Sequence, residues 1–161
     1  GNAAKVLQEI KGGALGCEQR ARELIGDMQD ELRQVREYSA AWPDRPRVYF
    51  EEWMDPLISG IRWVSEAIEI AGGRDVFAEL RDEPAAPDRI VASDAVVARD
   101  PQIILASWCG KPVDVAAIRR RPGWDQIAAV KTSQIYEIDG ADILAPARSS
   151  DDRPWPVVNS A

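Results

Sequence analysis

Apolar positions in the first forty residues follow a helical repeat. They recur at intervals of three and four residues between 18 and 38, which places them on one stripe of a helix. Charged residues occupy the remaining faces. We therefore predict one continuous helix over residues 18–38, ended by the proline-containing stretch 42–46. The apolar stripe comprises Ala21, Leu24, Ile25, Met28, Leu32 and Val35.

Beyond residue 46 the pattern changes to short apolar strands that alternate with helices. Strands are predicted over 47–53, 102–108 and 134–138, and helices over 61–71, 93–98 and 115–120. Ser93 and Asp94 are expected to cap the second of these helices and Asp114 the third. Gly72 and Gly73 are expected to end the first. The alternation predicts an α/β fold with a mainly parallel sheet and helices on both faces.

Three regions are expected from these patterns. A helical segment spans residues 1–45, an α/β region spans 46–148, and an irregular, polar and proline-rich tail spans 149–161. No apolar run approaches the roughly 20 residues that a membrane span needs. We recognise no signal peptide in the sequence as given.

Charge and residue content argue for binding and against catalysis. The net charge of -7 and the pI of about 4.7 make nucleic acid an unfavourable partner, because such a surface repels phosphates. The chain contains no His, which removes the commonest general base and metal ligand. Two cysteines cannot build a disulfide framework or a four-thiolate zinc site. We expect no catalytic residues, no metal site and no resident cofactor.

Candidate binding residues follow the predicted strands. In open α/β sheets, ligands bind outside the carboxyl ends of the strands, which selects residues 51–60, 107–111 and 139–144. Trp53 and Trp108 each stand at a strand exit and could together clamp a large flat ligand. The same two residues could instead close the core, and the sequence leaves both readings open.

Acidic and sulfur-containing residues surround the two tryptophans. Glu51 and Glu52 should point to opposite faces of a strand, and with Asp55 they are expected to form a solvated rim. Cys109 has no His to activate it, so a buried or pocket-lining thiol is favoured over a nucleophile. The basic run 119–121 is expected to be a solvated helix end.

The combination of several segments resembles the C-terminal lobe of cobalamin-type and ferric-siderophore-type (class III) periplasmic binding proteins. The resemblance covers about residues 5–145 in order. The segments that carry it are FEEW at 50–53, DPLISG at 55–60, IAGG at 70–73, SDAVVARDPQIIL at 93–105, RPGWDQIAAV at 121–130 and the strand at 134–138.

This resemblance implies a two-lobed protein with Rossmann-like lobes joined by a long helix, of which residues 18–38 would be part. The N-terminal lobe would be missing from this chain. The ligand would lie between the lobes, and the complex would dock on an ABC permease. Glu66 is a candidate for the docking carboxylate, with Glu51 and Glu52 as others. The residues expected to face the ligand are Glu52, Trp53, Asp55, Trp108, Cys109 and Asp142.

The resulting hypothesis is the substrate-binding component of an ABC importer for cobalamin or a related metal chelate, in the periplasm or elsewhere outside the cytoplasm. Ferric siderophores are the alternative within the same family, but their sites favour cations, whereas this rim offers carboxylates and only Lys111. A small α/β enzyme using Asp55 or Cys109 is an alternative of another class. A structural or interaction fragment without ligand is a third.

Overall fold

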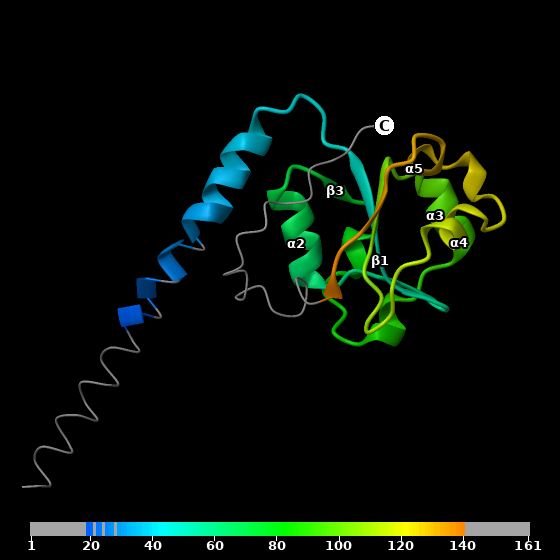
Figure 1. The fold of residues 1–161 in the computed structure, drawn as a ribbon, viewed down its shortest axis with the longest axis horizontal. Coiled ribbons are helices and arrows are strands. Elements are labelled where there is room, and N and C mark those ends of the chain that lie inside the picture. Colours follow the sequence, from blue (N-terminus) through cyan, green and yellow to red (C-terminus); the bar gives the residue numbers. More distant parts are fainter. Residues whose placement is uncertain (1–18, 21, 24, 28, 141–161) are drawn as a thin grey trace, which may run out of the picture. The chain divides into compact units, whose positions relative to one another are not determined.

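The computed structural model describes residues 19–20, 22–23, 25–27 and 29–140 (Figure 1). All of those between 19 and 40 are helical, which agrees with the predicted helix at every described position. This segment groups with residues 70–72 in one compact unit, and residues 45–69 and 73–140 belong to a second. Within the first unit, the Ser39 hydroxyl donates to the backbone carbonyl of Ile70 at 2.9 Å. The expected tail at 149–161 lies outside the described residues.

The second unit is built on an open sheet in which β1 is the central strand. β1 pairs in parallel with β4 on one side, and β4 pairs in parallel with β5. On its other side β1 pairs in parallel with β3 and antiparallel with β2. The predicted α/β class with a mainly parallel sheet is therefore confirmed. The strands are β1 (Arg47–Met54), β2 (Leu57–Ser59), β3 (Arg74–Asp75), β4 (Ile103–Ala106) and β5 (Ile135–Glu137).

Helices cover both faces of the sheet (Figure 1). α2 lies on one face, and α3, α4 and α5 lie on the opposite face together with short 3-10 segments. The predicted helices at 61–71, 93–98 and 115–120 are confirmed within one or two residues. The helices are α2 (Arg62–Ile70), α3 (Ser93–Arg99), α4 (Val115–Arg119) and α5 (Ala128–Lys131), and the 3-10 segments are η1 (Ala78–Leu80), η2 (Ala86–Arg89) and η3 (Trp124–Gln126).

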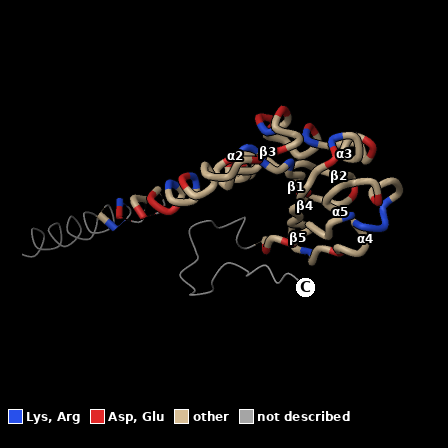
Figure 2. Tube along the Cα trace, turned by 90° about the horizontal axis from the view of Figure 1, so that it is seen from above, with Lys and Arg blue, Asp and Glu red and all other residues tan. Residues whose placement is uncertain are grey.

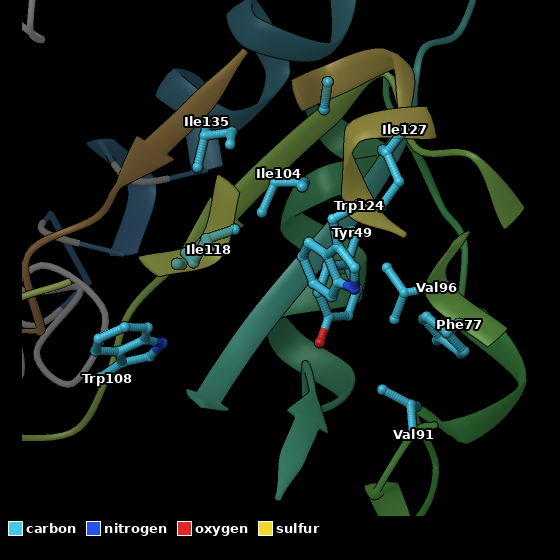
Figure 3. Close-up of a cluster of buried hydrophobic side chains, with 12 residues drawn as sticks. Tyr49, Phe77, Val91, Val96, Ile104, Trp108, Ile118, Trp124, Ile127 and Ile135 are labelled. Carbon is cyan, nitrogen blue, oxygen red and sulfur yellow. The ribbon is translucent and has the colours of Figure 1, made fainter. Parts of the chain in front are cut away.

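Alternation along β1 divides the apolar residues between two cores. Val48 and Phe50 pack with Val64 and Ile68 of α2. Tyr49 points to the other face, where it makes edge-to-face contacts with Phe77 and Trp124 at centroid distances of 5.6 and 6.2 Å (Figure 3). This second core is the larger and extends from the α3 side to Trp108 near the end of β4.

Two of the predicted helix ends behave as expected and one does not. The Asp114 carboxylate accepts the Ala117 N–H at 2.8 Å and caps α4. Gly72, past the end of α2, has a φ of 86°, which favours glycine. The prediction that Ser93 caps α3 is wrong, since Ala92 occupies the N-cap position. The Ser93 hydroxyl instead accepts the indole N–H of buried Trp124 at 2.8 Å.

Asp100 joins three elements at the amino end of the sheet. It has a φ of 44° in the turn between α3 and β4. One carboxylate oxygen accepts the Ala128 N–H at 2.8 Å, and the other accepts from the Arg47 guanidinium at 2.9 Å. The Asp-Pro turn that begins β4 is thereby tied to β1 and to the start of α5.

Asp75 is a buried carboxyl in β3 whose side chain accepts the Phe77 N–H at 2.9 Å. Burial raises its pKa above the usual range, and the neighbouring charges of Glu79 and Glu69 add to this. The folded chain therefore keeps this proton at pH values where the unfolded chain has lost it. By linkage, the stabilisation from this group is present below about pH 4 and declines as pH rises towards the folded pKa.

We predict that Asp75→Asn gains stability relative to the unmodified chain as pH rises from about 4 to 7, because asparagine has no charge to bury. Urea unfolding at a series of pH values measures the difference. Asp88→Asn, at an exposed position, is the matched control. A difference between Asp75→Asn and the unmodified chain that stays constant over this pH range would contradict the prediction.

Candidate functional site

Glu51 is a fully buried carboxylate on β1, with 0% of its surface exposed. Its Oε1 accepts the indole N–H of Trp108 at 3.0 Å and an N–H of Arg121 at 2.9 Å. Its Oε2 accepts a second N–H of Arg121 at 2.5 Å. The expectation of a solvated rim is therefore wrong for Glu51. Glu51 points to the same face of β1 as Tyr49, towards the interior. The three hydrogen-bond donors there offset the cost of burying its charge.

Arg121 completes this pair from the segment after α4. The basic run 119–121 is part of the blue stretch beside the α4 label in Figure 2. Its side chain is only 17% exposed, and its guanidinium lies 4.5 Å from the centre of the Trp124 ring. The expectation of a solvated basic run is wrong for this residue, because its charge is needed against Glu51 in the interior. Its neighbours Arg119 and Arg120 are exposed, as expected.

Tyr49 lies beside the same carboxylate. Burial raises the pKa of its phenol well above the ordinary value, and the negative charge of Glu51 raises it further. The phenol therefore remains neutral at physiological pH. Among the described residues its hydroxyl has no hydrogen-bond partner of good geometry.

Glu52 pairs with a different arginine. Arg89, itself buried, donates to the two carboxylate oxygens of Glu52 at 2.5 and 3.3 Å. Arg89 also donates to the Ser59 carbonyl at 2.5 Å, and so joins the end of β1 to β2 and η2. Adjacent strand residues point to opposite faces, which agrees with separate partners for Glu51 and Glu52. Glu52 is thus an ion-paired residue and not part of a solvated rim.

The two tryptophans differ in burial. Trp108 belongs to the core and is 5% exposed. Trp53 is half-buried, packs against the same core, and donates its indole N–H to the Asp55 carbonyl at 3.0 Å. The Lys111 ammonium lies 5.0 Å from the centre of the Trp53 ring. Lys111 follows Trp108 closely along the chain, so it brings the loop after β4 over the end of β1.

An open cleft of about 650 Å³ lies at the carboxyl ends of β4 and β5. This is the position at which the sequence analysis placed the candidate loops. Trp108 contributes to its wall as well as to the core, so the two readings of this residue are compatible. The described residues that line the cleft are Trp108, Gly110, Lys111, Pro112, Glu137, Ile138, Asp139 and Gly140.

The other candidates are less closely associated with the cleft. Cys109 is exposed and does not line it, so the expectation of a buried or pocket-lining thiol is wrong: the side chain projects outward from the turn after β4. Asp55 is exposed in the turn before β2, and Glu66 is exposed on α2. Asp142 lies outside the described residues. The assignment of these residues to a ligand or a permease stays a prediction.

Two residue groupings were missed from the sequence. Glu137 accepts the Val113 N–H at 2.9 Å, which holds the loop before α4 against β5 beside the cleft. The Glu51–Arg121 pair joins positions 70 residues apart, and no local pattern connects them. The available signal was the position of Glu51 between Tyr49 and Trp53 on one face of the predicted strand, since an acid buried among aromatic residues requires a buried cation.

Two negative findings concern the described residues. They contain no group of three acidic, His or Cys side chains that could hold a metal ion. None of the helices formed by them has the length and apolar character required to cross a membrane.

We predict that Arg121→Met destabilises the chain by about 3–5 kcal/mol, because the buried Glu51 charge loses its partner. Arg119→Met, an exposed neighbour in the same basic run, is the matched control and should change stability by no more than about 0.5 kcal/mol. Urea unfolding of the three proteins at pH 7 gives both values. Equal stabilities of the two variants would show that the pair does not hold the interior together.

Comparisons with known proteins agree with this fold. Residues 5–141 match the family described as periplasmic binding protein. The uncharacterized ABC transporter substrate-binding lipoprotein YvrC of Bacillus subtilis (strain 168) is 25% identical over 145 residues, which are 81% of this chain and 41% of that protein.

Two solved structures have similar folds. The periplasmic heme-binding protein RhuT from Roseiflexus sp. RS-1 is 22% identical with a TM-score of 0.63, over 80% of this chain and 50% of that one. The periplasmic vitamin B12 binding protein BtuF of Vibrio cholerae is 24% identical with a TM-score of 0.51, over 73% and 43%. The chain thus spans half or less of the length of each of these proteins. Because the family match extends over most of the sequence, the chain belongs to the periplasmic binding protein family, a family of binding proteins and not of enzymes.

Proposed function

We propose that this chain is the C-terminal lobe of the substrate-binding component of an ABC importer, and that its ligand is a metal chelate of the cobalamin type. The observation that carries the proposal is the cleft at the carboxyl ends of β4 and β5, walled by Trp108, in a chain of the periplasmic binding protein family. Its volume of about 650 Å³ falls within the range of small-molecule sites.

The character of the cleft favours a large ligand of low net charge. Among the described residues that line the cleft, Trp108, Pro112 and Ile138 supply apolar surface, and one cation, Lys111, lies with the carboxylates Glu137 and Asp139. An anionic ferric siderophore or the propionates of heme would need more positive charge than the described residues provide at the cleft. A corrinoid needs mainly apolar contact and scattered hydrogen bonds. Heme remains the second candidate, because RhuT is a heme-binding protein of similar fold.

The proposal also assigns a partner and a location. An importer's binding protein delivers its ligand to a membrane permease outside the cytoplasm, and we infer that this chain does so. Glu66 is exposed on α2 and has no partner among the described side chains, which leaves its carboxylate available for an arginine of the permease. YvrC, described as a lipoprotein of this kind, is consistent with the same location.

We predict that cobalamin binds the chain more tightly than heme or a ferric siderophore. Trp53 lies beside the cleft, with its ring 5.0 Å from the ammonium of the cleft-lining Lys111, so Trp53→Ala should weaken this binding by about 1–3 kcal/mol, the scale of a lost aromatic contact. Calorimetry and absorbance titration at high protein concentration measure the affinities, since a single lobe buries only part of a ligand. Trp63→Ala on α2, where the indole is 42% exposed, is the control and should leave binding unchanged.

Two outcomes would contradict different parts of the proposal. Equal cobalamin affinities of Trp53→Ala, Trp63→Ala and the unmodified chain would remove Trp53 from the site. Preferential binding of heme or of a ferric siderophore would leave the importer role in place and refute the cobalamin assignment.

A further inference from the structure

We propose that Glu51 is a positioning residue for the cleft: its buried carboxylate fixes the Trp108 indole at the cleft wall and so sets the surface that a ligand meets. This inference rests on the proposed function only where it concerns the ligand. Its first step concerns Trp108 alone.

Glu51 holds the loop after β4 at two points. Its backbone carbonyl accepts the Ser107 N–H at 3.0 Å, which continues the pairing of β1 with β4 up to the residue before Trp108. Its carboxylate accepts the Trp108 indole N–H at 3.0 Å. Trp108 lies outside any helix or strand. The direction of its side chain therefore depends on contacts of this kind and not on regular secondary structure.

The carboxylate cannot easily turn away from the indole, because Arg121 holds both of its oxygens. The two arginine N–H groups donate to Oε2 and Oε1 at 2.5 and 2.9 Å. Arg121 is itself held over the ring of Trp124, which is fully buried. The network thus runs from the core beneath α3, through Arg121 and Glu51, to the wall of the cleft.

The contribution of the carboxylate at this position is to determine the orientation of the Trp108 ring. An apolar pair in place of a buried ion pair is often neutral or stabilising, so filling the space does not require charge. An aliphatic residue at position 51 would leave the Trp108 N–H without its acceptor, and the ring could then adopt other orientations. Glu51 differs in this respect from the Arg47–Asp100 pair, which is on the same sheet but at the amino end of β1.

The test uses the double variant Glu51→Leu/Arg121→Met, which removes both buried charges together and leaves neither unpaired. Hydrogen exchange of the Trp108 indole N–H, identified by the signal lost in Trp108→Phe, is followed by NMR on the full chain. We expect exchange to accelerate by about tenfold or more relative to the core amides, since the bond lost is one to a charged acceptor. If this variant fails to fold, Glu51→Gln/Arg121→Gln takes its place, with a smaller acceleration of the same sign.

Arg47→Gln is the control for a loss of stability alone. It breaks a half-buried ion pair far from the cleft and should change indole exchange only in proportion to exchange of the core amides. If indole exchange in the double variant also accelerates only in proportion to exchange of the core amides, the proposal is overturned. Glu51 would then stabilise the fold without positioning Trp108.

Cobalamin titration tests the consequence for the ligand. We expect the double variant to bind about tenfold more weakly than the unmodified chain, and Arg47→Gln to bind equally well. Unchanged affinity in a variant whose indole exchange has accelerated would overturn the link to the ligand. If the unmodified chain binds no cobalamin, the proposed function fails, and indole exchange still decides whether Glu51 positions Trp108.

Discussion

The interior of the α/β unit is organised around a negative charge that has no contact with water. A carboxylate in this setting is tolerable only when its oxygens are occupied by strong donors. At Glu51 these come from Arg121 and Trp108, which belong to different parts of the chain. Satisfying this one group therefore fixes the segment after α4 and the loop after β4 relative to the central strand. The loop after β4, which is fixed in this way, forms part of the cleft wall.

Hydrophobic periodicity was sufficient for the architecture of this unit. The strands at β1, β4 and β5, the helices α2, α3 and α4 and the parallel order follow from alternation and spacing, and the position of the cleft follows from the strand direction. β2, β3 and α5 were not predicted, because their two to four residues are too few for a periodic signal. The hairpin between β1 and β2 was also missed, because residues 51–60 were interpreted as a region that follows the strand.

Charged residues were the weaker part of the sequence analysis. Glu51, Glu52 and Arg121 were all assigned to solvated surfaces, because most charges in proteins are exposed. Each is instead part of a bidentate ion pair, and the partners are 70 and 37 positions apart. Local patterns carry no information about such pairs. Trp108 was left between core and ligand contact, and its place in the core and at the cleft wall could be seen only from the three-dimensional arrangement.

The two faces of the sheet are unequally packed. Among the described residues, four buried apolar side chains hold the α2 face, whereas twelve form the core on the opposite face. Local opening requires less free energy where fewer apolar contacts are lost. Thermal fluctuations that detach a helix should therefore be concentrated at α2. The layer that contains Trp108 would keep its structure during such opening. Local unfolding at α2 would therefore leave the geometry of the cleft largely unchanged.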